Sequence, residues 1–174
     1  MKRIIFLLAF TLSVSMVGAQ NIDFSKYQSI KFMDIEIDGH VVEFVRQLLS
    51  KGVHHIDEAY DKEGQVVFMG SFERYSAMIF VYSNPVNNEV WGTQVLIDSG
   101  GGQYLDRDYQ FFKQLFERKY EALYMKTVIE DGKEKLTIAD YEKKTHMLEL
   151  KRDTIEGLLR ILFINKFNVE SMQQ

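Results

Sequence analysis

The fold is indicated by a segment that occurs twice, as EFVRQLLSK at residues 43–51 and as QFFKQLFER at residues 110–118. The two copies are 67 residues apart, and a Gln-Leu pair at 47–48 in the first matches a Gln-Leu pair at 114–115 in the second. Each copy also carries apolar residues at helical spacing. Self-similarity at one offset is typical of a chain built from repeated units.

The first copy lies in a predicted helix at about 39–51. One apolar helical face is formed by Val41, Phe44, Val45, Leu48 and Leu49. Asp38 precedes this segment, and its side chain can cap the free N–H groups at the start of a helix. Gly52 stands where a left-handed residue commonly ends a helix.

Strand-like segments follow this helix at 53–58, 65–72, 75–83 and 89–98, and polar turns separate them. Short strands joined by short turns favour an antiparallel meander. After the glycine-rich loop at 99–102, a second helix is predicted to begin near Leu105, with Asp106 or Asp108 favouring its N-terminus. Its apolar stripe contains Tyr109, Phe112, Phe116 and Tyr120.

The offset of 67 continues into the strands and predicts further strands at 132–139, 143–150 and 157–164. Residues 155–165 fit either a helix after Asp153 or a strand, and the repeat register favours the strand. The predicted fold is therefore α+β, with two tandem repeats of a helix followed by a four-stranded antiparallel meander sheet. The repeats span about 33–98 and 104–165 of a single globular domain at 20–174.

Composition excludes several classes of protein. The chain has 174 residues, a formal net charge of −4 and no Cys. An acidic balance argues against nucleic acid as a partner, because nucleic-acid binders present a basic stripe. The lack of Cys excludes disulfides, thiolate catalysis and Cys-ligated metal sites.

The N-terminus predicts export. Lys2 and Arg3 precede an apolar run, and residues 17–19, Val-Gly-Ala, fit a signal-peptide cleavage site. We expect a cleaved signal peptide at 1–19 and a periplasmic or secreted protein. Its removal leaves 155 residues with a formal net charge of −6, in which no later run is typical of a transmembrane span.

Residues 32–39, FMDIEIDG, and the helix that ends at Lys51-Gly52 resemble the start of small uncharacterised secreted proteins of Bacteroidetes, which often read Phe-x-Gly-x-Pro-Ile-Asp-Gly. This chain has Asp34 and Glu36 where Gly and Pro are usual. Residues 157–165 are similar to the final strand of these proteins. The tandem repeat also resembles, at the level of fold alone, the beta-lactamase inhibitor protein. Neither resemblance implies a catalytic residue or a cofactor.

The motifs examined for chemistry predict no catalytic or metal site. Ser99 lies in an Asp-Ser-Gly-Gly segment but lacks the residues that surround a protease nucleophile, so the segment is interpreted as a connector between repeats. His54 and His55 are adjacent, and neighbouring strand residues point to opposite faces. At best, His55 and Asp57 could supply two ligands, fewer than a catalytic zinc site requires.

Aromatic residues give the one candidate binding site. In the predicted strand at 75–83, alternate residues are apolar on both faces, with Met78, Phe80 and Tyr82 opposite the row expected to face a helix. Such residues are enriched at interfaces, and we expect Phe80, Tyr82 and Trp91 to bind a protein or an envelope component. The hypothesis is a non-enzymatic binding or inhibitor-like module. The alternatives are an envelope assembly or structural factor, or a small hydrolase that uses Ser99 or scattered carboxylates; a second sheet or a dimer could also cover the aromatic row.

Overall fold

The computed structural model describes residues 30–56, 61–120, 125–130, 133–139 and 146–171. The predicted signal peptide at 1–19 and the residue Asp57 lie outside these ranges. The elements follow in the order α1 (Val41–Ser50), β1 (His54–His55), β2 (Gln65–Phe72), β3 (Tyr75–Ser83), β4 (Val90–Asp98), α2 (Gly102–Lys119), β5 (Met125–Glu130), β6 (Lys133–Ala139), β7 (His146–Asp153), β8 (Leu158–Asn165) and α3 (Lys166–Ser171).

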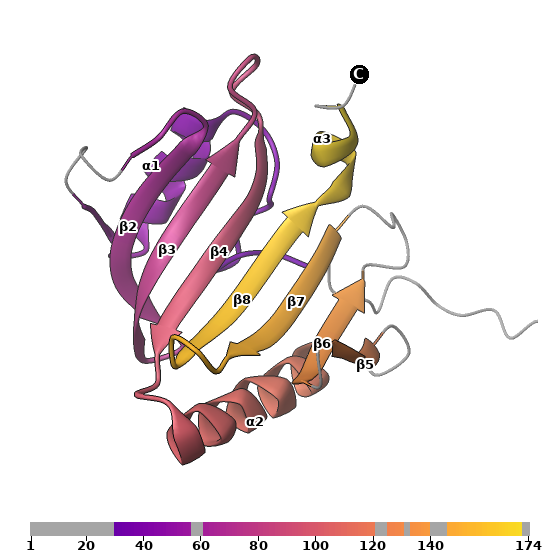
Figure 1. Cartoon of the computed structure of the whole chain (residues 1–174). Helices are drawn as coiled ribbons and strands as arrows, with labels where there is room; N and C mark the ends of the chain where they lie inside the picture. The colour runs from indigo at the N-terminus through magenta and orange to yellow at the C-terminus, as the bar shows by residue number, and fades with distance from the viewer. Residues whose placement is uncertain (1–29, 57–60, 121–124, 131–132, 140–145, 172–174) are drawn as a thin grey trace, which may run out of the picture.

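All eight strands belong to one antiparallel sheet with the order β1-β2-β3-β4-β8-β7-β6-β5, of which Figure 1 labels the strands from β2 to β5. Each helix-plus-four-strand unit forms one half of the sheet, and the last strands of the two units, β4 and β8, pair at its centre. The predicted α+β fold with two such units is therefore confirmed. The ambiguous segment at 155–165 contains strand β8, as the repeat register favoured.

The start of α1 differs from the prediction. His40, not Asp38, is the N-terminal cap, and its Nδ1 atom accepts a hydrogen bond from the backbone N–H of Val42 at 3.3 Å. Asp38 instead accepts hydrogen bonds from the N–H of Gly39 at 2.8 Å and from the side chain of Asn168 at 3.3 Å. The predicted helix end is confirmed, since Gly52 has a φ of 84°.

The second helix begins earlier than expected. It starts at Gly102 rather than near Leu105, and Gly101 occupies the cap position without a side-chain hydrogen bond. Asp108 lies in the second turn and is 2% exposed. Its Oδ1 atom accepts hydrogen bonds from the Tyr75 hydroxyl at 3.2 Å and from the Arg107 guanidinium, so this aspartate joins α2 to β3.

The core lies on the face of the sheet that carries α1 and α2. Buried side chains from both helices and from alternate strand positions form one continuous hydrophobic cluster. The buried residues of the two helices correspond at an offset of 68 residues. Phe44 and Leu48 of α1 match Phe112 and Phe116 of α2. The offset of 67 instead sets Phe44 beside Phe111, which is 39% exposed, so it is wrong by one residue within the helices.

The C-terminal helix α3 closes the edge of this core. The Asn165 side chain donates to the carbonyl of Ile37 at 2.9 Å, and the Asn168 side chain donates to the carbonyl of Val90 at 2.7 Å. Both asparagines are buried. These bonds satisfy the backbone oxygens of Ile37 and Val90, and they attach α3 and the end of β8 to the first repeat.

Candidate functional site

The opposite face of the sheet carries every second residue of each strand, and no helix within the described ranges packs on it. We call it the open face, and Figure 1 looks onto it with α1 behind β2 and β3. The strand pairing places a line of residues directly across the sheet, each beside the next on the neighbouring strand. That line consists of Met69, Met78, Leu96, Arg160, Lys151, Lys135 and Val128.

Along this line the open face changes from an apolar half to a charged half, between Leu96 on β4 and Arg160 on β8. The apolar half covers β2, β3, β4 and part of β8. Its half-buried or exposed apolar side chains are Met69, Met78, Phe80, Tyr82, Trp91, Leu96, Leu162 and Ile164. The sheet of a helix-backed antiparallel fold normally presents polar residues to water, so an apolar strip of this length is unusual. The face is not exposed throughout, because Val67, directly opposite Phe80 on β2, is 1% exposed.

Trp91 reaches the open face because of an irregularity in β4. The register between β3 and β4 shifts after Tyr82, so that Tyr82 pairs with Gly92 and Ser83 pairs with Val90. Val90 and Thr93 are both fully buried on the core side. The two residues between them therefore face the same way, as in a β-bulge, and simple alternation would have turned Trp91 into the core.

Phe80, Tyr82 and Trp91 form what we call the aromatic cluster. The ring centroids of Phe80 and Tyr82 are 6.4 Å apart and those of Tyr82 and Trp91 are 4.9 Å apart, with nearly parallel planes in both pairs. The Tyr82 hydroxyl donates to Oε1 of Gln94 at 2.7 Å, which fixes the ring, and burial raises the pKa of Tyr82. The structure thus brings together all three aromatic residues that the sequence singled out.

The charged half of the open face contains Arg160, Lys151 and Lys135 in direct succession on β8, β7 and β6. Arg160 lies 2.9 Å from Oδ2 of Asp153, and Lys135 lies 2.9 Å from Oε2 of Glu130. The hydrogen bond from Lys135 lowers the pKa of the Glu130 carboxyl. Lys151, between the two paired cations, is exposed and has no ion pair within the described part of the chain.

A hollow of about 440 Å³ lies over this charged half, and it was not predicted from the sequence. Its lining includes Gln94, Lys135, Lys151 and Arg160, which come from one strand of the first repeat and three strands of the second. Alternation within each strand gives the face of each residue, but only the central β4–β8 pairing brings the two halves together.

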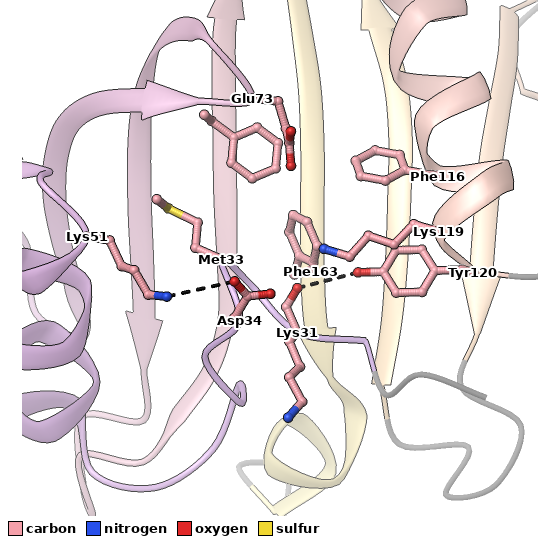
Figure 2. A pocket seen from close by; sticks show the side chains of 10 residues that line it. Lys31, Met33, Asp34, Lys51, Glu73, Phe116, Lys119, Tyr120 and Phe163 are labelled. Atoms are coloured by element: carbon pink, nitrogen blue, oxygen red, sulfur yellow. Dashed lines mark hydrogen bonds and ion pairs between the residues drawn. The ribbon is translucent and has the colours of Figure 1, made fainter. Parts of the chain in front are cut away.

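A second cavity, of about 250 Å³, lies on the core side between the two repeats, and Figure 2 shows its lining. Its floor is aromatic, and its rim mixes cations and carboxylates. Lys51 Nζ lies 3.8 Å from Oδ2 of Asp34, and the Tyr120 hydroxyl donates to the backbone carbonyl of Lys31 at 3.5 Å (Figure 2). A second rim cation, Lys31, is paired with Glu36 at 2.8 Å.

An apolar groove of about 580 Å³ runs along the outer side of α1, lined by Val42, Leu49 and Val66. Val42 and Leu49 are 68% and 45% exposed. His55 and Asp61 form its polar border, with a 2.8 Å contact between His55 Nε2 and Asp61 Oδ2.

The residues considered for chemistry do not converge. The Ser99 hydroxyl oxygen is buried and has no hydrogen-bond partner in the structure. His54 and His55 are both on the short edge strand β1. No group of three or more His, Asp or Glu side chains with the spacing of a metal site occurs within the ranges that the structure covers.

The helices that the structure describes are all too short or too polar to cross a membrane. Comparison with known protein families, with curated proteins and with solved structures found no match to this chain.

Proposed function

We propose that the chain is an exported, non-enzymatic binding module of an inhibitor-like kind, whose open face binds a protein of the periplasm or the cell envelope. The observation that carries the proposal is the aromatic cluster on a sheet face that the described helices leave uncovered. Aromatic residues and methionines are enriched at the centres of protein interfaces, where they provide large contact areas at a small entropic cost.

The construction of the cluster supports a binding role over a structural one. A bulge costs regular ladder pairing, and here it moves the only Trp of the chain from the core side to the open face. Gln94 then holds Tyr82 in a fixed position through its side-chain oxygen. A surface whose side chains are already ordered loses less entropy when it binds a partner.

The resemblance to small secreted proteins of Bacteroidetes is part of the proposal. Asp34 replaces the usual Gly of their pattern, and its φ of 66° is the left-handed conformation that such a Gly would adopt. Asp tolerates that conformation better than most residues, so this departure is compatible with the same turn. The likeness to the beta-lactamase inhibitor protein likewise remains a proposal about fold and mode of binding.

The hydrolase alternative receives less support from the geometry. An activated serine requires a base within hydrogen-bond reach, and the Ser99 hydroxyl makes no such bond in the structure. The alternative of an envelope assembly or structural factor uses the same open face and differs only in the partner.

Affinity capture of the mature protein from periplasmic and membrane fractions tests the proposal. The test variant is Phe80→Ala with Tyr82→Ala, and the matched control is Val42→Ala with Leu49→Ala, which removes exposed apolar side chains from α1. We expect a stoichiometric partner that the control retains and the test variant loses while still folded. A partner retained by both variants, or no partner at all, would contradict the proposal.

A further inference from the structure

Three cations lie side by side on the open face, and the middle one, Lys151, makes no ion pair with a described carboxylate. The hollow over them is lined by five Lys or Arg residues and three Asp or Glu residues. Lys151 is directly opposite Arg160 on one neighbouring strand and directly opposite Lys135 on the other. Directly opposed residues of antiparallel strands have Cβ atoms only about 5 Å apart, and like charges in this position destabilise a sheet. Arg160 is paired with Asp153 and Glu156, and Lys135 is paired with Glu130 and Glu149, whereas Lys151 has no ion pair with any residue that the structure describes.

Lys151, which has no ion pair among the described residues, adjoins the apolar half of the same face. Leu96 is opposite Arg160, and Leu162 is opposite Glu149, two residues before Lys151 on β7. Lys151 is in line with Met78, which lies three strands away and two residues before Phe80. For typical strand spacing and rise, Lys151 and Phe80 are therefore about 16 Å apart. An extended segment of about five residues covers that distance.

We propose that the open face binds an acidic protein segment, in which a carboxylate contacts Lys151 and an apolar side chain about five residues away packs on the aromatic cluster. This inference rests on the proposed function and adds the chemistry of the partner. A carboxylate at Lys151 would give an ion pair to the one cation of the row that has none among the described residues.

The surrounding acids favour a protein partner over a phosphate polymer or a membrane surface. Glu130, Glu149 and Asp153 lie between and beside the cations, so a dense array of phosphates would meet repulsion at each of them. A single carboxylate followed by apolar residues matches the one exposed cation and the strip beside it.

Selection from a random displayed library of twelve-residue peptides tests the inference. The mature protein is compared with Lys151→Glu and with the charge-matched control Lys62→Glu, at an exposed turn before β2. We expect the wild type and the control to enrich Asp or Glu four to six residues from an aromatic or aliphatic residue, and Lys151→Glu to lose that preference. Lys151→Glu should remain folded and melt about 1–3 °C higher, because it replaces a like-charge contact.

A selected peptide without Trp is then titrated while the fluorescence of Trp91, the only Trp, is recorded. We expect Lys151→Glu to weaken its binding at least tenfold, and added salt to weaken wild-type binding. Peptides that require Phe80 and Tyr82 but show no acidic preference would refute this inference and leave the proposed function standing. Peptides indifferent to both sites would refute the two together. Co-sedimentation with vesicles of phosphatidylglycerol that is lost in Lys151→Glu would also overturn the inference, in favour of a membrane surface.

Discussion

Two phenylalanines on opposite faces of the sheet should differ sharply in their contribution to stability. Phe163 on β8 is 1% exposed and its ring packs against Phe32, Phe72 and Phe116 with centroid distances of 5.3, 6.2 and 6.3 Å. Phe80 is half-buried on the open face, and its ring has Tyr82 as its stacking neighbour. Replacing each with Ala removes the same atoms from two different environments.

The expected free energies of unfolding follow from that difference. Phe163→Ala leaves a cavity that the surrounding rings cannot fill, at a cost of about 3–5 kcal/mol. Phe80→Ala loses about half the transfer free energy of a buried Phe and one stacking contact, about 1.5–2.5 kcal/mol in all, and leaves no enclosed cavity. With a urea m-value of about 2 kcal/mol/M, the unfolding midpoint should fall by about 2 M for Phe163→Ala and by about 1 M for Phe80→Ala.

Urea unfolding followed by circular dichroism measures both midpoints on the mature protein. Equal losses for the two variants would refute the reasoning, because they would mean that something covers the open face as completely as the helices cover the core. A loss for Phe80→Ala that depends on protein concentration would identify a second copy of the chain as the cover.

Three further predictions concern the fold. Gly70→Ala should destabilise the protein by roughly 1–3 kcal/mol in urea unfolding, because an added Cβ would lie 2.6 Å from Cγ1 of Val53, and Val53→Ala should relieve part of that loss. Asn168→Ala should cost about 1–3 kcal/mol by the same measurement, since it removes the bond to the carbonyl of Val90, and a loss below about 0.5 kcal/mol would contradict this. Burial raises the pKa of Tyr120 to about 12, above the value of about 10 for an unfolded chain. The protonated form is therefore favoured by folding, and the resulting stability is present below pH 10 and lost as the pH rises to 12. Tyr120→Phe should reduce this alkaline loss, and unfolding curves at pH 9 and pH 11 that show the same loss in both proteins would oppose the assignment.

The sequence predicts most of the architecture because local patterns and the repeat agree. Strands β2 and β3 match the predicted ranges to the residue, since a polar turn bounds each of them. The segment at 155–165 shows the value of the repeat, because its apolar spacing fits a helix and a strand equally and only the register decides.

Features that depend on the tertiary context are not predictable from such patterns. The bulge that turns Trp91 outward arises from the pairing of two strands, so the sequence predicts Trp91 as a binding residue without the feature that places it on the open face. His40 is the N-terminal cap of α1 in place of the stronger candidate Asp38, whose side chain accepts from the N–H of Gly39 instead. The cation row at Lys151 requires the relative register of three strands, which no local pattern contains.

The most direct test of the open face as a binding surface is site-specific photo-crosslinking in intact cells. A photoreactive residue replaces Met78, which is half-buried on the open face, or Val42, which is exposed on α1. We expect position 78 to form one discrete crosslinked product and position 42 to form none. A product from position 42 alone would contradict the account and assign binding to the helical side.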